Sequence, residues 1–132
     1  MLILVLLLLY LKDAGLYKEL LFENIQINST ADLAHHTEAN AAVKVTGSKT
    51  EGALMIFAEQ LGAGNYLDTR NSADIIKLWP FSSSNKRMDV VVRRNDDSLV
   101  LYTKGAAEII VELCSAFVLD NEVVPMTPTK TT

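Results

Sequence analysis

The segment Thr46-Gly47-Ser48-Lys49-Thr50 carries residue types that bind phosphate in many proteins. A phosphate-cradling P-loop needs an opening glycine and an adjacent Gly-Lys pair, so that backbone N–H groups encircle the phosphates. Here Ser48 separates Gly47 from Lys49, and the residues upstream supply no glycine. The segment is therefore not a P-loop.

Metal binding and thiol chemistry have little support in the sequence. His35 and His36 are adjacent in a polar stretch without other ligands at suitable spacing, and we interpret them as solvated side chains. Cys114 is the single cysteine, which excludes an internal disulfide or a zinc site and fits a reducing compartment. We expect Cys114 to be a buried, inert thiol on a helix. The sequence contains no serine-elbow motif, Cys–His pairing or evident carboxylate pair.

The length and composition indicate one globular domain. A chain of 132 residues with 49% hydrophobic and 21% charged residues can bury a single core. The net charge of -4 argues against a general affinity for nucleic acid, which needs clustered lysine and arginine.

The first eleven residues form an apolar run that ends at Lys12-Asp13. A membrane-spanning helix needs about 20 apolar residues, and a secretory signal needs a positive residue before the run. Three interpretations remain: a signal-like or membrane-contacting leader, the end of a truncated segment, or a wrongly chosen start, and we favour the last two together. We expect a leader over 1–12, a partial domain over 13–120 and a frayed tail over 121–132.

Helical spacing of apolar residues predicts three helices. The first runs from Leu16 to Ile25 and ends at a polar turn, and residues 31–42 are expected to be loop or weak structure. The second runs from Glu51 to Leu61, with Thr50 as its cap and Gly62 as its end. The third starts at Ala106. Apolar residues expected on the buried faces of the last two helices are Ala53, Leu54, Phe57, Ala58 and Leu61, and Ile109, Ile110, Leu113, Cys114 and Phe117.

The middle of the chain changes to strands. Ile75–Trp79, Met88–Arg94 and Leu99–Thr103 are short runs rich in β-branched and aromatic residues. The polar residues 95–98 between the last two runs predict a hairpin turn. We therefore expect an α+β fold, with an antiparallel β-sheet flanked by helices.

Four segments, in order along the chain, match the motifs of one known family. Trp79-Pro80-Phe81-Ser82-Ser83-Ser84-Asn85-Lys86-Arg87-Met88 resembles that family's Phe-Ser segment ending in Lys-x-Met, and Lys104-Gly105-Ala106-Ala107-Glu108 resembles its Lys-Gly-Ala motif. Upstream, Gly47–Leu54 resembles Gly-x-x-Thr-Glu-x-Ala-Leu, and Ile27–Thr30 resembles the segment that opens the domain. In this order, the four segments resemble the nucleotide-binding (N) domain of P-type cation-transporting ATPases, and their residues are most similar to those of plasma-membrane-type calcium pumps. We expect a partial domain that is incomplete at its C-terminal end.

The resemblance implies a set of ATP-binding residues. Phe81 would stack on adenine, Glu51 would accept a hydrogen bond from its exocyclic amine, and Lys104 would lie along the pocket wall. Gly105 would let the backbone approach the ligand, because it lacks a Cβ. The remaining members would be Lys86, facing the phosphates, and Met88, an apolar contact.

Two residues depart from the family pattern in the turn before Met88. Asn85 stands where a basic residue is common, and Arg87 where a small polar one is common. Positive charge therefore lies at a different place in this turn than in the family pattern, and the phosphate contact expected at Lys86 has different neighbouring charges.

The resemblance also implies partners and a location. ATP would bind with its accompanying Mg²⁺, and the remaining pump domains would complete a membrane protein whose N domain faces the cytoplasm. The family's phosphorylated Asp-Lys-Thr-Gly-Thr motif does not occur in the 132 residues, so we expect no turnover by this chain alone. Two alternatives stay open: a non-catalytic decayed fragment or protein-interaction module, and the same domain from another P-type pump.

Overall fold

The structure is a computed structural model that describes residues 15–34 and 42–127. The apolar leader, His35 and His36 lie outside these described residues, as does the end of the expected tail. No helix within the described ranges is long and apolar enough to cross a lipid bilayer.

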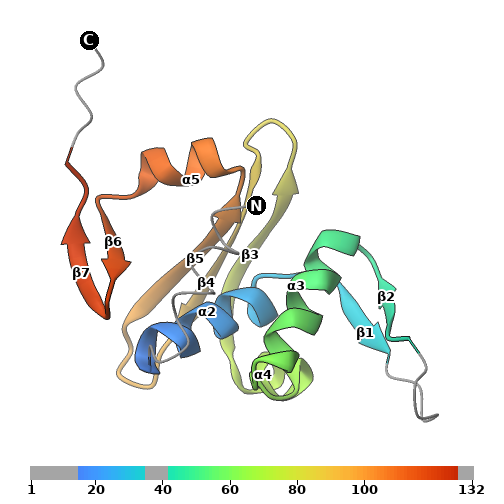
Figure 1. Cartoon of the computed structure of the whole chain (residues 1–132). Helices are drawn as coiled ribbons and strands as arrows, with labels where there is room; N and C mark the ends of the chain where they lie inside the picture. Colours follow the sequence, from blue (N-terminus) through green and yellow to red (C-terminus); the bar gives the residue numbers. More distant parts are fainter. Residues whose placement is uncertain (1–14, 35–41, 128–132) are drawn as a thin grey trace.

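Helix α2 (Gly15–Ile27) lies between the two halves of the described fold (Figure 1). Its Leu21, Phe22 and Ile25 pack with residues of the other helices, whereas Ile27 packs against the sheet. The predicted first helix is therefore confirmed, and it contributes to both hydrophobic clusters.

A three-stranded antiparallel sheet, β3 (Asp74–Ser82), β4 (Arg87–Arg93) and β5 (Leu99–Gly105), covers one side of α2. Strand β4 is central, and its alternate residues Met88, Val90 and Val92 are buried. β3 continues past Pro80 because an edge strand tolerates proline, which has no N–H to donate. The three predicted strands are confirmed.

The predicted turn between β4 and β5 is also confirmed. Arg94 and Ser98 close it through a backbone hydrogen bond of 2.8 Å, and Asp97 adopts a left-handed conformation with φ 63°. Asp96 accepts hydrogen bonds from both the backbone and the hydroxyl of Ser98, which fixes the loop.

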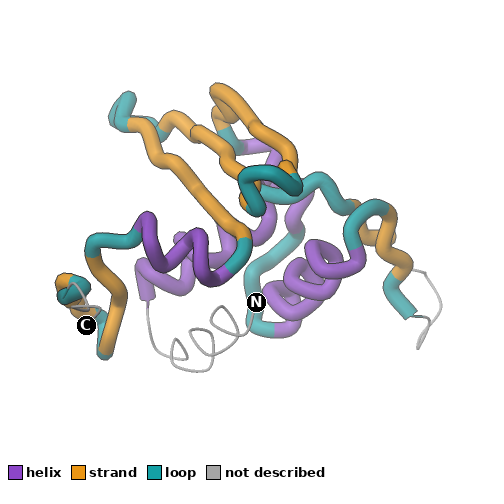
Figure 2. The backbone as a smooth tube through the Cα atoms, turned by 90° about the horizontal axis from the view of Figure 1, so that it is seen from above, coloured by secondary structure: helices purple, strands orange, loops and turns teal. Residues whose placement is uncertain are grey.

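The second half contains α3 (Lys49–Gln60) and α4 (Tyr66–Ser72) with a small sheet of β1 (Asp32–Ala34) and β2 (Lys44–Thr46). Its core is formed by the side chains of α2, α3 and β1 together with Tyr66. The backbone path of these helices and strands is drawn in Figure 2. β1 is a strand of three residues in a stretch that was expected to be loop or weak structure.

Two expectations about α3 are wrong. The side chain of Ser48, not Thr50, caps the helix by accepting a hydrogen bond from the N–H of Glu51. Ala53 is exposed, and Met55 is fully buried instead. The helix starts two residues earlier than predicted, at Lys49, and its buried residues are Glu51, Gly52, Met55 and Ala58.

The C-terminal prediction also needs correction. The third helix, α5 (Ala107–Leu113), ends before Cys114, and Phe117 lies on a strand of the hairpin β6 (Ala116–Leu119) and β7 (Glu122–Pro125). Cys114 is exposed rather than buried. Asp120 and Asn121 both have positive φ, as a two-residue type I′ hairpin turn requires. Part of the expected frayed tail is therefore a paired strand.

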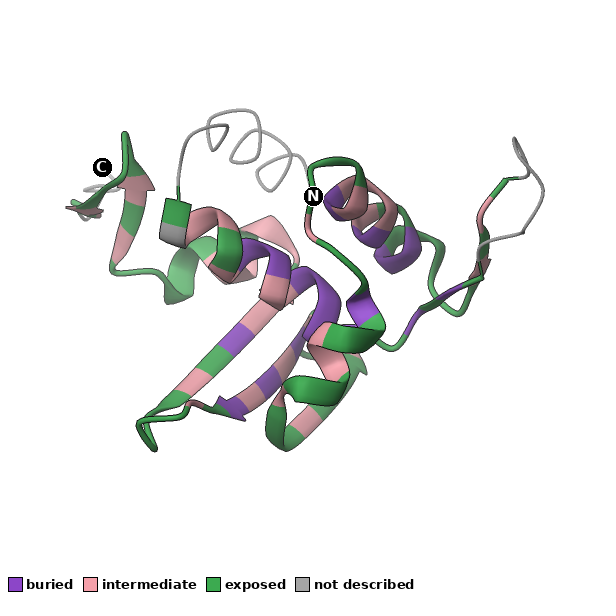
Figure 3. Ribbon diagram, turned by 90° about the horizontal axis from the view of Figure 1, so that it is seen from below, coloured by how far each residue is buried: buried purple, intermediate pink, exposed green. Residues whose placement is uncertain are grey.

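The α+β prediction is confirmed, with antiparallel sheets and helices packed against them. Buried residues gather on α2, α3 and β4, whereas α5 and the hairpin β6–β7 contain none (Figure 3).

Candidate functional site

An ion pair joins the two halves of the fold. Nζ of Lys104 on β5 lies 2.6 Å from Oε1 of Glu51 on α3, although 53 residues separate them in the chain. The side chains are 19% and 10% exposed, so little water screens the contact. The family resemblance assigned both residues to one site, but it did not predict that they bind each other.

The other carboxylate oxygen of Glu51 is held by Thr30. The backbone N–H of Thr30 lies 3.1 Å from Oε2 and its hydroxyl 3.2 Å from the same atom. Glu51 therefore accepts three hydrogen bonds, one at Oε1 and two at Oε2.

The electrostatics of the pair follow from its burial. Burial by itself raises the pKa of Glu51, but the hydrogen bond and charge of Lys104 and the two bonds from Thr30 outweigh it, so the pKa lies below its ordinary value. Burial lowers the pKa of Lys104, although Glu51 acts in the opposite direction, and the charge of Arg70 lowers it further. Glu51 is thus held as an ionised acceptor.

The sheet register brings further predicted residues to the same end of the sheet. Met88 pairs with Lys104, and Arg87 pairs with Gly105. Met88 is 1% exposed and lies on the same face as Lys104, because residues directly opposite each other in a sheet point to one side. It is a buried neighbour of Lys104.

Gly105 is needed for a contact within the protein. A Cβ at this position would lie 2.3 Å from the carbonyl oxygen of Lys86 and 2.8 Å from Cα of Arg87. The same carbonyl accepts a hydrogen bond of 2.9 Å from the N–H of Ala106. The missing side chain therefore lets the turn before β4 close on the Lys-Gly-Ala segment.

Phe81 projects from the irregular end of β3. The regular register breaks between the pairs Trp79–Asp89 and Ser82–Arg87, which brackets Pro80 and Phe81. The Phe81 residue is 60% exposed. An exposed ring thus sits at the end of the sheet that carries Lys104 and Gly105. Among the described residues, no cation–π contact joins Phe81 to Lys104.

Lys86 has an unusual backbone and an exposed partner. Its φ is 52°, a left-handed conformation that is uncommon for residues other than glycine. Its Nζ lies 3.6 Å from Oε1 of Glu108 in the first turn of α5, and both side chains are more than half exposed. Such an exposed pair contributes little to stability.

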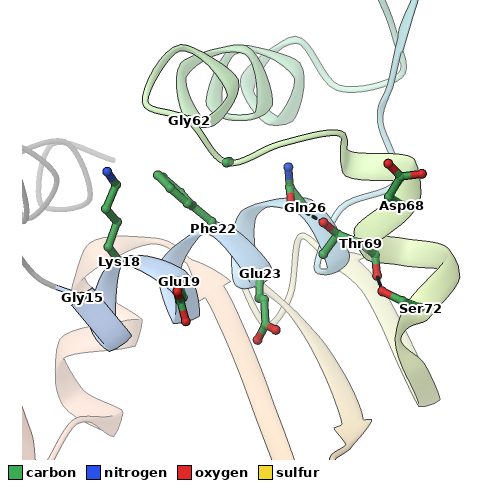
Figure 4. A pocket seen from close by; sticks show the side chains of 11 residues that line it. Gly15, Lys18, Glu19, Phe22, Glu23, Gln26, Gly62, Asp68, Thr69 and Ser72 are labelled. Atoms are coloured by element: carbon green, nitrogen blue, oxygen red, sulfur yellow. Dashed lines mark hydrogen bonds between the residues drawn. The ribbon is translucent and has the colours of Figure 1, made fainter.

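A separate groove of about 940 Å³ lies between α2, α4 and the loop after α3 (Figure 4). None of the predicted site residues lines it. Its buried polar side chains already bind within the protein: Gln26 accepts a hydrogen bond of 2.7 Å from Thr69 and donates one to the carbonyl of Gly64. The groove is therefore not the site that the sequence indicated.

Within residues 15–34 and 42–127, no group of three or more histidine, cysteine, aspartate or glutamate side chains can hold a metal ion. The candidate site in the described part of the chain combines an aromatic ring, a carboxylate, two ammonium groups and a glycine-dependent turn.

This combination of fold and site defines a domain class. The family described as "P-type ATPase, cytoplasmic domain N" matches residues 16–132, and the chain belongs to it. The predicted family is confirmed.

The chain is also similar to individual proteins that are named as calcium-transporting ATPases. The chain is 44% identical over 100 residues to Calcium-transporting ATPase 2 of Cryptococcus neoformans, covering 76% of this chain and 7% of that protein. It is 37% identical over 100 residues to Calcium-transporting ATPase PAT1 of Dictyostelium discoideum, covering 76% and 9%. It is 33% identical over 102 residues to Calcium-transporting ATPase 9, plasma membrane-type, of Arabidopsis thaliana, covering 77% and 9%. The chain thus spans less than a tenth of these three relatives.

Proposed function

We propose that this chain is an ATP-binding N domain that works at the cytoplasmic face of a membrane, within a calcium-transporting P-type ATPase. The other pump domains are its partners, and one of them supplies the aspartate that accepts the phosphoryl group. The chain by itself binds nucleotide and does not turn it over.

The contact between Lys104 and Glu51 carries this proposal. Two residues that the family motifs assign to one pocket meet at 2.6 Å from different elements. Phe81, Lys86 and Gly105 lie at the same end of the sheet, as the strand register requires. The site thus offers a ring for stacking beside groups that recognise a polar edge, which fits a purine nucleotide.

The chemistry of Glu51 favours adenine over guanine. A carboxylate has about four lone-pair sites, and three are already used by Lys104 and Thr30. The remaining site on Oε1 can accept a hydrogen bond from the exocyclic amine of adenine. Guanine presents a carbonyl oxygen at that position, which an ionised carboxylate repels.

The phosphates extend towards Lys86 in this proposal. Lys86 exchanges its exposed partner Glu108 for a phosphate oxygen, which offers more negative charge. Mg²⁺ arrives with ATP and balances the phosphate charge; the described residues of this chain contribute no ligand cluster of their own.

A nucleotide titration tests the proposal. The 132-residue chain is titrated with ATP–Mg and with GTP–Mg while amide NMR shifts or Trp79 fluorescence are followed. We expect tighter binding of ATP, with the largest shifts around Glu51, Phe81 and Lys104. Equal responses to both nucleotides count against adenine recognition.

Two phenylalanine variants distinguish the loss of a stacking contact with adenine from the loss of any exposed aromatic side chain. Phe81→Ala is expected to weaken ATP binding about threefold to tenfold, the loss of one aromatic stacking contact. Phe117→Ala, which truncates a ring that is 43% exposed on β6, is the matched control and should bind ATP normally. Normal binding by Phe81→Ala contradicts the stacking role.

The exposed apolar surface of α5 and the hairpin β6–β7 favours the alternative of a protein-interaction module. Large hydrophobic side chains there lie in solvent, including Leu113, Phe117 and Val123. A folded chain that ignores both nucleotides in the titration would favour this function.

A further inference from the structure

The segment Ile27–Thr30 is the one family motif to which no ligand role is assigned above. It includes the last residue of α2 and leads to β1, and it contacts both the sheet and α3. Its polar side chains bind both of these elements, so it bridges the two halves of the candidate site.

Asn28 binds this segment to the sheet. It is fully buried, and its side-chain amide donates to the carbonyl oxygens of Met88 (3.2 Å) and Tyr102 (3.4 Å). Met88 is the cross-strand neighbour of Lys104, and Tyr102 is the preceding residue on the same face of β5. The segment is therefore placed relative to Lys104.

The next residues bind the segment to α3. The hydroxyl of Ser29 lies 3.5 Å from the sulfur of Met55, and Thr30 donates twice to Oε2 of Glu51. Gly47, with φ 92°, packs against Cα of Ala31 (3.3 Å from the site of an added Cβ), which holds the turn before α3 against the segment. The backbone of Thr30 is thus fixed from two sides.

We propose that Thr30 is a positioning residue that makes the site selective for adenine. Its N–H and hydroxyl saturate Oε2 of Glu51 and fix the carboxylate plane. Only Oε1, beside Lys104, then stays open to a ligand. This inference rests on the proposed nucleotide-binding function and assigns purine discrimination to a residue that does not contact the base.

The test compares Thr30→Val, which removes the hydroxyl, with Thr30→Ser, which keeps it. Thr30 is exposed, so both variants should fold; Thr30→Ala serves as a second variant without the hydroxyl. Thr46→Val makes the same chemical change on exposed β2 and is the matched control. Each chain is titrated with ATP–Mg and GTP–Mg, and the pKa of Glu51 is measured by carboxyl NMR without nucleotide.

Thr30→Val and Thr30→Ala should reduce the preference for ATP over GTP about threefold to tenfold, the effect of one hydrogen bond. Both should raise the pKa of Glu51, because a donor to its charged form is lost. Thr30→Ser and Thr46→Val should match the original chain in both measurements.

Two results overturn the inference: an unchanged Glu51 pKa and nucleotide preference in a folded Thr30→Val chain, or a loss in Thr30→Ser equal to that in Thr30→Val. Failure of the proposed nucleotide-binding function can be distinguished from failure of the inference about Thr30. If the original chain binds neither nucleotide, the proposed function is wrong, and the pKa measurement alone decides whether Thr30 holds the carboxylate.

Discussion

At the scale of single residues, Gly105 illustrates how a missing side chain allows two backbone segments to pack closely. Its backbone φ is not in the left-handed region, so its requirement is for space and not for conformation. The carbonyl of Lys86 occupies the position where a side chain would stand, and Lys86 itself adopts a left-handed φ. The two features together fix the turn that carries Lys86.

We predict that Gly105→Ala destabilises the chain by about 1–3 kcal/mol, the cost of forcing an extra methyl group into a packed contact. The clash is with backbone atoms, which cannot rotate away as a flexible side chain can. Denaturant unfolding measures the loss, and amide NMR should show the largest shifts at Lys86 and Arg87. Unchanged stability and unchanged shifts at those two residues would contradict the packing explanation.

At the scale of elements, a second polar cluster fastens α2 to the hairpin β4–β5. Arg94 binds both carboxylate oxygens of Glu23, at 3.0 and 2.6 Å, and the hydroxyl of Tyr102 also binds Glu23. Burial and Glu23 raise the pKa of Tyr102, which keeps the phenol as a donor. The cluster fixes the position of α2 on the sheet. It therefore also fixes the start of the segment after α2, which contains Asn28 and Thr30.

This cluster predicts a loss of stability in acid. Burial by itself raises the pKa of Glu23, but its bonds to Arg94 and Tyr102 outweigh it, so the pKa lies below its ordinary value of 4.5. A carboxyl group with a lowered pKa stabilises the fold above the ordinary value, and that stabilisation disappears as the pH falls through the folded-state pKa. The free energy of unfolding should therefore decrease as the pH falls below about 4.5.

Glu23→Gln should reduce stability at pH 7 by about 1 kcal/mol or more and flatten this pH dependence. Unfolding in denaturant at several pH values measures both effects. Glu112→Gln, on the exposed part of α5, is the control and should follow the original curve. A Glu23→Gln chain with the original acid dependence would show that Glu23 is not responsible.

At the scale of the whole molecule, Arg70 on α4 joins three parts of the chain. Its guanidinium donates to the carbonyl oxygens of Gln26 (2.7 Å) and Ala31 (2.8 Å) and pairs with Asp32 at 3.1 Å. It also stacks on Tyr66, with 4.7 Å between Cζ and the ring centroid. Arg70 thus holds both ends of the segment that carries Asn28 and Thr30.

We predict that Arg70→Met destabilises the chain by about 2 kcal/mol or more, because two carbonyl groups lose a charged donor. Arg93→Met removes an exposed ion pair with Asp74, 3.8 Å long, and should cost less than about 1 kcal/mol. Thermal and denaturant unfolding of the two variants provide the comparison. Equal losses would mean that Arg70 acts only through general surface charge.

Much of the local structure follows from neighbouring residues alone. Apolar periodicity predicted α2, and β-branched runs around residues 95–98 predicted the β4–β5 hairpin, because both patterns depend on short-range geometry. The Asp120-Asn121 pair between apolar runs was a comparable signal for the hairpin β6–β7, but extending the helix through Cys114 hid it. The motifs also identified the family.

The site itself required the tertiary structure. Sequence motifs named Glu51 and Lys104 but not their mutual contact, and they gave no role to Thr30, Asn28 or Arg70, which fix that contact. Hydrogen bonds between residues 21 to 74 positions apart depend on how α2, α3, α4 and the sheet pack, and no local pattern encodes that packing. The residue types therefore specify the available chemistry, whereas the packing determines which atoms remain open to a ligand.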